Sequence, residues 1–157
     1  NIPAYKEHEA LNWLKERVSI LTYEEDEIIN FSNWNARAIY FYDADNNIVE
    51  FISRRNLNNK TSNFFNSKQL LNISEIGITT NNIETIYRVL NLIKPIPVFD
   101  GSFDSFCAVG NDIGLFILVN IDKKDWFPTN DKIYISDFIL KGDYNFEYKG
   151  GMIIKSY

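Results

Sequence analysis

The stretch that decides the fold runs from residue 33 to residue 55 and reads NWNARAIYFYDADNNIVEFISRR. Two runs typical of β-strands, Ala38–Tyr42 and Ile48–Ile52, flank the turn formers of residues 43–47, DADNN. Asp and Asn side chains hydrogen-bond their own backbone and tolerate positive φ angles, so this pattern predicts a β-hairpin. Alternation along the second strand places Glu50 on one face with an isoleucine on either side of it. Such a carboxylate indicates either a sheet edge or a cavity that needs a charge.

The size of the chain, its charge and its single cysteine limit the classes of protein to which it can belong. A chain of 157 residues is long enough for one sizeable core or for two small modules. The net charge is −5 and the basic residues are scattered, which argues against nucleic-acid binding. Cys107 has no second cysteine to pair with, and apolar runs such as Leu115–Val119 are too short to cross a bilayer. We therefore expect a cytoplasmic protein that is not inserted in a membrane.

The predicted elements occur in the same order twice. A strand, a helix and three further strands precede an Asn- and Ser-rich segment, and the same order follows it. We therefore expect an α+β fold built from two βαβββ modules. The predicted boundaries are 1–55 for the first module, 56–72 for a linker, 73–120 for the second module and 121–157 for a C-terminal β extension.

Two alignments relate the predicted modules. Leu90 follows Leu14 by 76 positions, and this shift superposes the two predicted helices. On the same shift the counterpart of Glu75 falls just upstream of Asn1, so we expect the first module to lack its opening strand within the given residues. Aligning the closing hairpins pairs Glu50 with Leu118, which is 68 positions later, and loops absorb the difference.

The hairpin Tyr40–Ile52 resembles the closing hairpin of the vicinal oxygen chelate superfamily, which includes glyoxalase I, bleomycin-resistance proteins and extradiol dioxygenases. The family's usual pattern there is Tyr-Phe-x-Asp-Pro-Asp-Gly-Asn-x-x-Glu, and this chain carries Ala44 for Pro and Asn46 for Gly. Ile73–Ile78 is similar to the opening strand of a second family module, with Glu75 where His is usual. The resemblance implies that paired modules form a curved mixed sheet or open barrel around a small-molecule cavity, commonly in a homodimer.

The resemblance also implies a divalent metal held by the first and last strands of each module. Its four positions fall upstream of Asn1, on Glu50, on Glu75 and on Leu118, and a leucine cannot bind a metal. Two close carboxylates without a cation repel each other, so one of them would stay protonated. Glu50 and Glu75 are thus candidate metal ligands or catalytic groups of an incomplete site.

Aromatic and amide side chains near the strands are candidate ligand contacts, and each can equally be an ordinary core or turn residue. They are Trp34, Asn35, Tyr40, Tyr42 and Phe116.

We expect structural roles for the other side chains that could take part in chemistry. Arg54 and Arg55 point to opposite faces of their strand, so at most one of them could reach a bound anion, and we expect a surface role for them. His8 is predicted to be solvated on the first helix, and Cys107 to be a small core residue rather than a nucleophile. Trp126 is predicted to belong to a hydrophobic cover over a sheet.

Three functions remain open on the sequence alone. The favoured one is a small-molecule-binding protein with a metal-poor cavity, because Leu118 removes a metal ligand and the strands are aromatic. The alternative is a metal-dependent lyase or dioxygenase of the glyoxalase type, in which Glu50 and Glu75 hold a divalent ion. The third is a non-catalytic interaction module that uses the acidic surface and the C-terminal strands.

Overall fold

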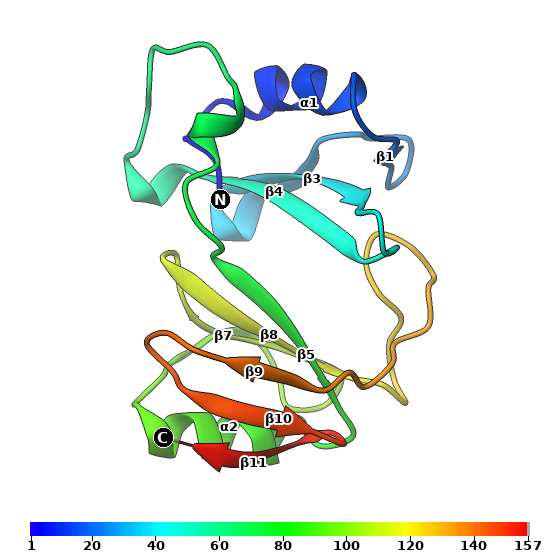
Figure 1. Cartoon of the computed structure of the whole chain (residues 1–157), viewed down its shortest axis with the longest axis vertical. Helices are drawn as coiled ribbons and strands as arrows, with labels where there is room; N and C mark the ends of the chain where they lie inside the picture. The colour runs from blue at the N-terminus through cyan, green and yellow to red at the C-terminus, as the bar shows by residue number, and fades with distance from the viewer. Residues whose placement is uncertain (157) are drawn as a thin grey trace. The chain divides into compact units, whose positions relative to one another are not determined.

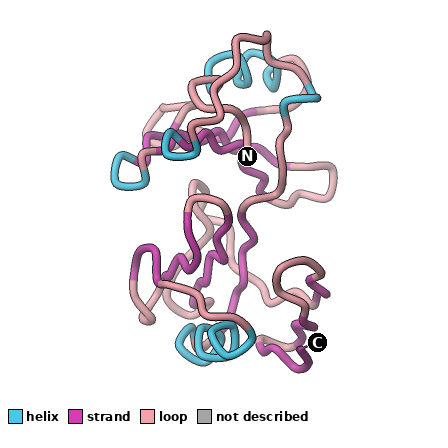
Figure 2. Tube along the Cα trace, turned by 90° about the vertical axis from the view of Figure 1, so that its left-hand side faces the viewer, coloured by secondary structure: helices cyan, strands magenta, loops and turns pink. Residues whose placement is uncertain are grey.

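The computed structural model describes residues 1–156 and divides into two units, Asn1–Ile73 and Ser74–Tyr157 (Figure 1). Each unit has one α-helix lying against its own β-sheet (Figure 2), and the second unit has an additional sheet of three strands. The predicted α+β class is confirmed. The residues predicted as a linker belong to the first unit, where the buried Phe65 packs into the core beneath the helix.

The first unit is built around its longest strands, β3 (Ala36–Tyr42) and β4 (Ile48–Arg54). These pair with each other, while β1 (Ile20–Leu21) and β2 (Ile29–Phe31) both pair with the other edge of β3. The helix α1 (Glu7–Lys15) buries an apolar stripe that includes Leu11 and Leu14 against this sheet. Three short 3₁₀ turns complete the unit: η1 (Ser32–Trp34), η2 (Arg55–Leu57) and η3 (Ser67–Gln69).

The predicted hairpin is present between β3 and β4. Tyr42 pairs with Ile48 at its end, and the Asp43 carboxylate accepts hydrogen bonds from the backbone N–H groups of Asp45 at 2.9 Å and Asn47 at 2.8 Å. Asn46 has a φ of 62°, which is the left-handed conformation that asparagine tolerates. The hydrogen bonds that Asp43 accepts, chiefly from Asn47, lower the pKa of its carboxyl group.

An opening strand is reduced in the first unit to a single parallel bridge. Ile2 pairs with Ser53 on the free edge of β4, and the Ile2 N–H donates to the carbonyl of Ile52 at 2.8 Å. The described residues of this unit therefore follow the βαβββ order, with one bridge in place of a full first strand and with the two short strands β1 and β2, on the same edge of β3, in place of one strand after the helix.

The second unit has the same connectivity with a complete opening strand. The strands β5 (Glu75–Thr80), β6 (Val98–Gly101), β7 (Phe106–Asn111) and β8 (Gly114–Asn120) lie in the order β5-β8-β7-β6, and β5 runs parallel to β8. The helix α2 (Ile83–Ile93) follows the cap residue Asn82, whose side chain accepts a hydrogen bond from the N–H of Thr85 at 3.0 Å.

The strand registers confirm one of the two predicted shifts and correct the other. Ile2 pairs with Ser53, and Ile78, which lies 76 residues after Ile2, pairs with Leu118. Leu118 therefore corresponds to Ser53, 65 residues earlier, and not to Glu50. Because successive side chains point to opposite faces, an odd difference of three residues also moves the position to the other face. The true counterpart of Glu50 is Leu115, and Leu118 packs in the core beneath α2.

The C-terminal strands complete the core of the second unit. The strands β9 (Phe138–Leu140), β10 (Phe146–Lys149) and β11 (Met152–Ser156) form an antiparallel sheet in the order β11-β10-β9. Phe146 and Tyr148 are buried in the same apolar cluster as α2. The Tyr148 hydroxyl donates to the backbone carbonyl of Thr79, and burial raises the pKa of Tyr148 to about 12.

The opposite face of the β5–β8 sheet is covered by the segment that follows β8. The Trp126 indole lies over Gly77, where an added Cβ would stand 2.5 Å from the ring atom Cη2. The Thr79 hydroxyl donates to the carbonyl of Tyr134 at 2.8 Å, which ties the end of the same segment to β5. Trp126 thus forms the cover over the sheet that was predicted.

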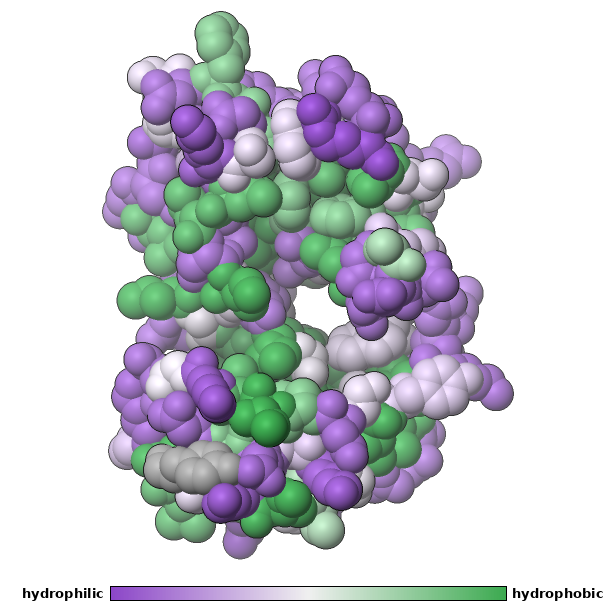
Figure 3. All heavy atoms as spheres, in the orientation of Figure 1, coloured by the Kyte–Doolittle hydropathy of each residue, from purple (hydrophilic) through white to green (hydrophobic). Residues whose placement is uncertain are grey.

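The surface of the described residues is mixed. Figure 3 shows apolar side chains between polar ones on the visible face of both units, and exposed large apolar residues include Phe64, Leu92 and Ile113. Within residues 1–156, neither α-helix is long and apolar enough to cross a membrane.

The contact between Trp126 and Gly77 yields a test of the second unit. We expect Gly77→Ala to lower the free energy of unfolding by about 1–3 kcal/mol, because the new methyl group overlaps the indole. Urea unfolding followed by far-UV circular dichroism measures this. The matched control is Gly142→Ala, whose Cβ would meet no atom within 4 Å. In a Trp126→Ala background the effect of Gly77→Ala should disappear, and an undiminished effect there would contradict the contact.

Candidate functional site

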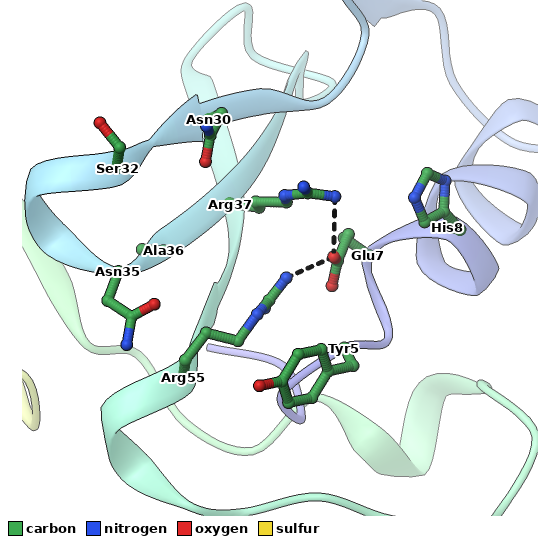
Figure 4. Close-up of a pocket in the computed structure, with 9 residues that line it drawn as sticks. All are labelled: Tyr5, Glu7, His8, Asn30, Ser32, Asn35, Ala36, Arg37 and Arg55. Atoms are coloured by element: carbon green, nitrogen blue, oxygen red, sulfur yellow. Dashed lines mark hydrogen bonds and ion pairs between the residues drawn. The ribbon is translucent and has the colours of Figure 1, made fainter.

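A pocket of about 520 Å³ opens in the first unit between the start of α1 and the strands β2 and β3 (Figure 4). Its lining is mostly polar and comes from three segments of the chain, residues 5–8, residues 30–37 and Arg55. The lining residues are Tyr5, Glu7, His8, Asn30, Ser32, Asn35, Ala36, Arg37 and Arg55.

Glu7 is the buried charged group of this pocket and is only 3 % exposed. Its oxygen Oε1 accepts a short hydrogen bond from Nη2 of Arg55 and lies 3.5 Å from Nη1 of Arg37 (Figure 4). Its other oxygen, Oε2, is buried with no hydrogen-bond partner among the described residues. An unpaired buried acceptor of this kind is costly, so it requires an explanation.

Comparison of the two modules shows that the fold does not require this carboxylate. The 76-residue shift places Glu7 on Ile83, which is fully buried at the same position of α2. On the same shift Leu14 corresponds to Leu90, and both are buried in their cores. The first module therefore carries a charge where the second carries an ordinary apolar core residue.

Arg55 is held firmly from several directions. Its Nη1 donates to the Ser53 hydroxyl at 2.6 Å and to the Ser53 carbonyl at 3.3 Å. Its guanidinium carbon lies 4.3 Å from the centroid of the Tyr5 ring. The side chain is only 11 % exposed, so Arg55 serves to position Glu7 rather than to meet solvent.

Arg37 contrasts with Arg55 in its exposure. Its side chain is 42 % exposed, and the 3.5 Å ion pair to Glu7 is its only charged contact within residues 1–156. A guanidinium has five N–H donors, so most of those on Arg37 can face the pocket or solvent. With His8 neutral, the two arginines and one glutamate give the pocket lining a formal charge of +1.

Two residues at the pocket have unusual backbone conformations. Tyr5 has a φ of 67°, its N–H donates to the Ser53 hydroxyl at 3.2 Å, and it is 56 % exposed. Asn35 has a φ of 48°, and its side-chain amide donates to Asn56 at 2.8 Å. Positive φ costs free energy for a residue with a Cβ, and such conformations concentrate at functional sites.

The expected surface role of the arginine pair is wrong. Arg54 is fully buried, with its guanidinium carbon 5.5 Å from the centroid of the Trp34 ring, and Arg55 is buried on the opposite side of the strand. Strand alternation separates the two as predicted. Each guanidinium lies over an aromatic ring, and Arg55 is also paired with Glu7; such contacts offset part of the cost of burying a positive charge.

Of the predicted ligand contacts, the structure places Asn35 in the pocket lining. Trp34 stacks on Phe31 with ring centroids 5.7 Å apart, and the Tyr40 hydroxyl donates to Oε1 of Glu50 at 2.5 Å. Tyr42 follows Tyr40 by two residues and shares its face of β3. Phe116 is a core residue beneath α2, where its ring meets Tyr144 at 5.1 Å.

Glu50 and Glu75 lie in different units and share one feature. Val49 and Phe51 pack towards α1, so Glu50 projects from the other face of its sheet. Ile76 and Ile78 pack beneath α2, so Glu75 likewise faces away from its helix. Within residues 1–156, no three or more His, Cys, Asp or Glu side chains are grouped so as to hold a metal ion. The described residues therefore do not form a complete metal site.

The remaining predictions for single residues are confirmed. His8 is exposed at the rim of the pocket. Cys107 is fully buried, and burial raises the pKa of its thiol, which keeps it in the unreactive protonated form.

Glu7, Tyr5 and Arg37 were not predicted as site residues. A signal for Glu7 was present, because the 76-residue shift aligns it with Ile83 and so places a charge at a core position. Nothing in the local sequence indicates that Arg37 reaches Glu7, since they meet only through the packing of α1 on β3.

No known protein-family model matches the chain, and no curated protein matches it significantly. The resemblance to the vicinal oxygen chelate superfamily therefore remains an expectation.

The buried ion pair can be tested by a double-mutant cycle. We expect Glu7→Ala and Arg55→Ala to show a coupling free energy of about 2 kcal/mol, because each leaves a largely buried charge unpaired. Urea unfolding of the single and double mutants measures it. The matched control is the exposed helix pair Glu84 and Arg88, for which we expect less than about 0.5 kcal/mol. Equal coupling in both cycles would contradict the burial of Glu7.

Proposed function

We propose that the chain is a small-molecule-binding protein and that its first unit binds a small organic anion in the pocket beside Glu7. The observation that carries this proposal is the exposed guanidinium of Arg37. It lies beside the buried ion pair of Glu7 and Arg55, and it contacts Glu7 at 3.5 Å. The resemblance implies small-molecule binding in general, and the pocket beside Glu7 is the site that we propose for it.

The dimensions and chemistry of the pocket support a ligand of this class. A volume of about 520 Å³ is within the range of small-molecule sites. The formal charge of the lining favours an anion, and a planar guanidinium binds carboxylates and phosphates through paired hydrogen bonds. Asn30, Ser32 and Asn35 line the pocket with polar groups that can contact the rest of the ligand.

The surrounding residues supply a rigid base for such a contact. Arg55 is fixed by Ser53 and Tyr5, and it in turn holds Glu7. Arg37 is the second residue of β3 and is paired there with both β4 and β2, so its backbone is held while its end can move. A site of this type needs little reorganisation when a ligand binds.

The test is a binding screen with a matched pair of arginine variants. Small carboxylates and phosphate monoesters, with and without an amino group, are screened by ligand-observed NMR and then by calorimetry. We expect at least one to bind and Arg37→Gln to weaken its affinity at least tenfold. Arg88→Gln removes an exposed arginine of α2 and should leave the affinity unchanged. If no compound binds, or if both variants behave alike, the proposal fails.

A metal-dependent enzyme of the glyoxalase type is the second candidate. The observation that favours it is that Glu50 and Glu75 both project from the face of their sheet that is turned away from the helix. Within either unit a metal on this carboxylate would need further ligands, because one carboxylate is fewer than metal sites normally use. A homodimer and a cytoplasmic location belong to the same family-based expectation.

Elemental analysis of the purified protein tests the metal alternative. The alternative predicts a stoichiometric divalent ion that is lost in Glu50→Gln and retained in Glu27→Gln, which changes an exposed ion-paired glutamate. A metal-free protein that does not respond to added Mn²⁺, Ni²⁺, Zn²⁺ or Fe²⁺ would exclude it. An ion that is retained in Glu50→Gln would also exclude it.

A further inference from the structure

We infer that the ligand of the Glu7 pocket is a zwitterion of the α-amino acid class, whose carboxylate contacts Arg37 and whose ammonium group contacts Glu7. This inference rests on the proposed function and specifies the chemistry of the same site. It adds a requirement for a positive, hydrogen-bond-donating group beside the anionic one.

The unpartnered oxygen of Glu7 is the first observation behind the inference. Glu7 is 97 % buried, since only 3 % of it is exposed, yet Oε2 accepts no hydrogen bond within the described part of the chain. Figure 4 shows both ion-pair lines meeting at the other oxygen, while this oxygen lies on the side of Tyr5 and away from Arg37. Because Oε2 is itself buried, a donor from a ligand reaches it only when the side chains over it shift, and the charged acceptor that the described residues leave unsatisfied then gains a partner.

The divergence between the two modules is an independent observation. In the second unit the counterparts of Glu7 and Arg55 are Ile83 and Asn120, neither of which carries a charge. Asn120 uses its side-chain amide to bond the backbone carbonyl of Asn81 at 3.4 Å. The same fold is therefore completed without charges in one module, and the charged pair of the other module is an addition that the fold does not need.

The charges also have the spacing that an α-amino acid requires. Nη1 of Arg37 and Oε1 of Glu7 lie 3.5 Å apart, so the two opposite charges are adjacent. In an α-amino acid a single carbon separates the nitrogen from the carboxyl carbon, which places them about 2.5 Å apart. The long ion pair between two side chains can thus be replaced by two shorter contacts to one ligand, with charge balance retained.

A simpler ligand can contact only one of the two groups, Arg37 or Glu7, favourably. A carboxylate without an amino group would bring a second negative charge close to Glu7, and the two would repel. An amine without a carboxylate would contact Glu7 but would bring a third positive charge close to Arg37 and Arg55. Because both opposite charges are required, neither half of the ligand alone should bind well.

The test compares three matched probes: L-glutamine, glutaramate, which lacks the ammonium group, and 4-aminobutanamide, which lacks the carboxylate. The shared amide suits the polar lining at Asn30, Ser32 and Asn35. We expect calorimetry on the wild-type protein to show L-glutamine binding at least tenfold more tightly than either analogue. Equal or tighter binding of glutaramate overturns the inference, and this comparison does not depend on any variant being folded.

Glu7→Gln supplies the second arm of the test. It removes the negative charge and keeps the shape, so L-glutamine should bind at least tenfold more weakly while glutaramate binds as well or better. Thermal unfolding establishes first that the variant is folded. If glutaramate binds the wild type tightly and is lost in Arg37→Gln, the anion site stands and the zwitterion inference fails. If none of the three probes binds, the zwitterion inference fails, while the wider anion screen decides the proposed function separately.

Discussion

The parallel pairing of each module's opening strand with its closing strand is the constraint on which the rest of the structure depends. It consists of one bridge between Ile2 and Ser53 in the first unit and of the full β5–β8 pairing in the second. Parallel neighbours need a crossover, and the helix that makes the crossover must cover one face of the sheet. In the first unit the same bridge brings Tyr5 onto Ser53, so that Arg55 can reach both Tyr5 and Glu7.

The two modules place different chemistry on this shared frame. The second unit covers one face of its sheet with α2 and the C-terminal strands, and Trp126 lies against the other. The first unit instead buries a carboxylate at the start of its helix and compensates it with one fixed and one exposed arginine. Buried ion pairs contribute little net stability compared with apolar packing, so a charged pair at a core position indicates a role other than stability.

Much of the fold followed from local pattern. The hairpin and the repeated order of elements both depend on neighbouring residues, and both are present in the structure. The predicted alignment of the closing strands was wrong by three residues, because the hairpin loops of the two modules differ in length. An error of three residues reversed the face of Leu118, since strand side chains alternate.

The sequence by itself determined the α+β class, the two βαβββ modules and the buried, unreactive state of Cys107, because periodicity and turn chemistry are local properties. Only the tertiary structure decided that Glu7, Arg37 and Arg55 meet in one pocket, because each comes from a different element and their contacts depend on how α1 packs against β3 and β4. It also decided that Arg54 and Arg55 are buried, since burial of a charge depends on the aromatic and carboxylate partners that distant segments bring.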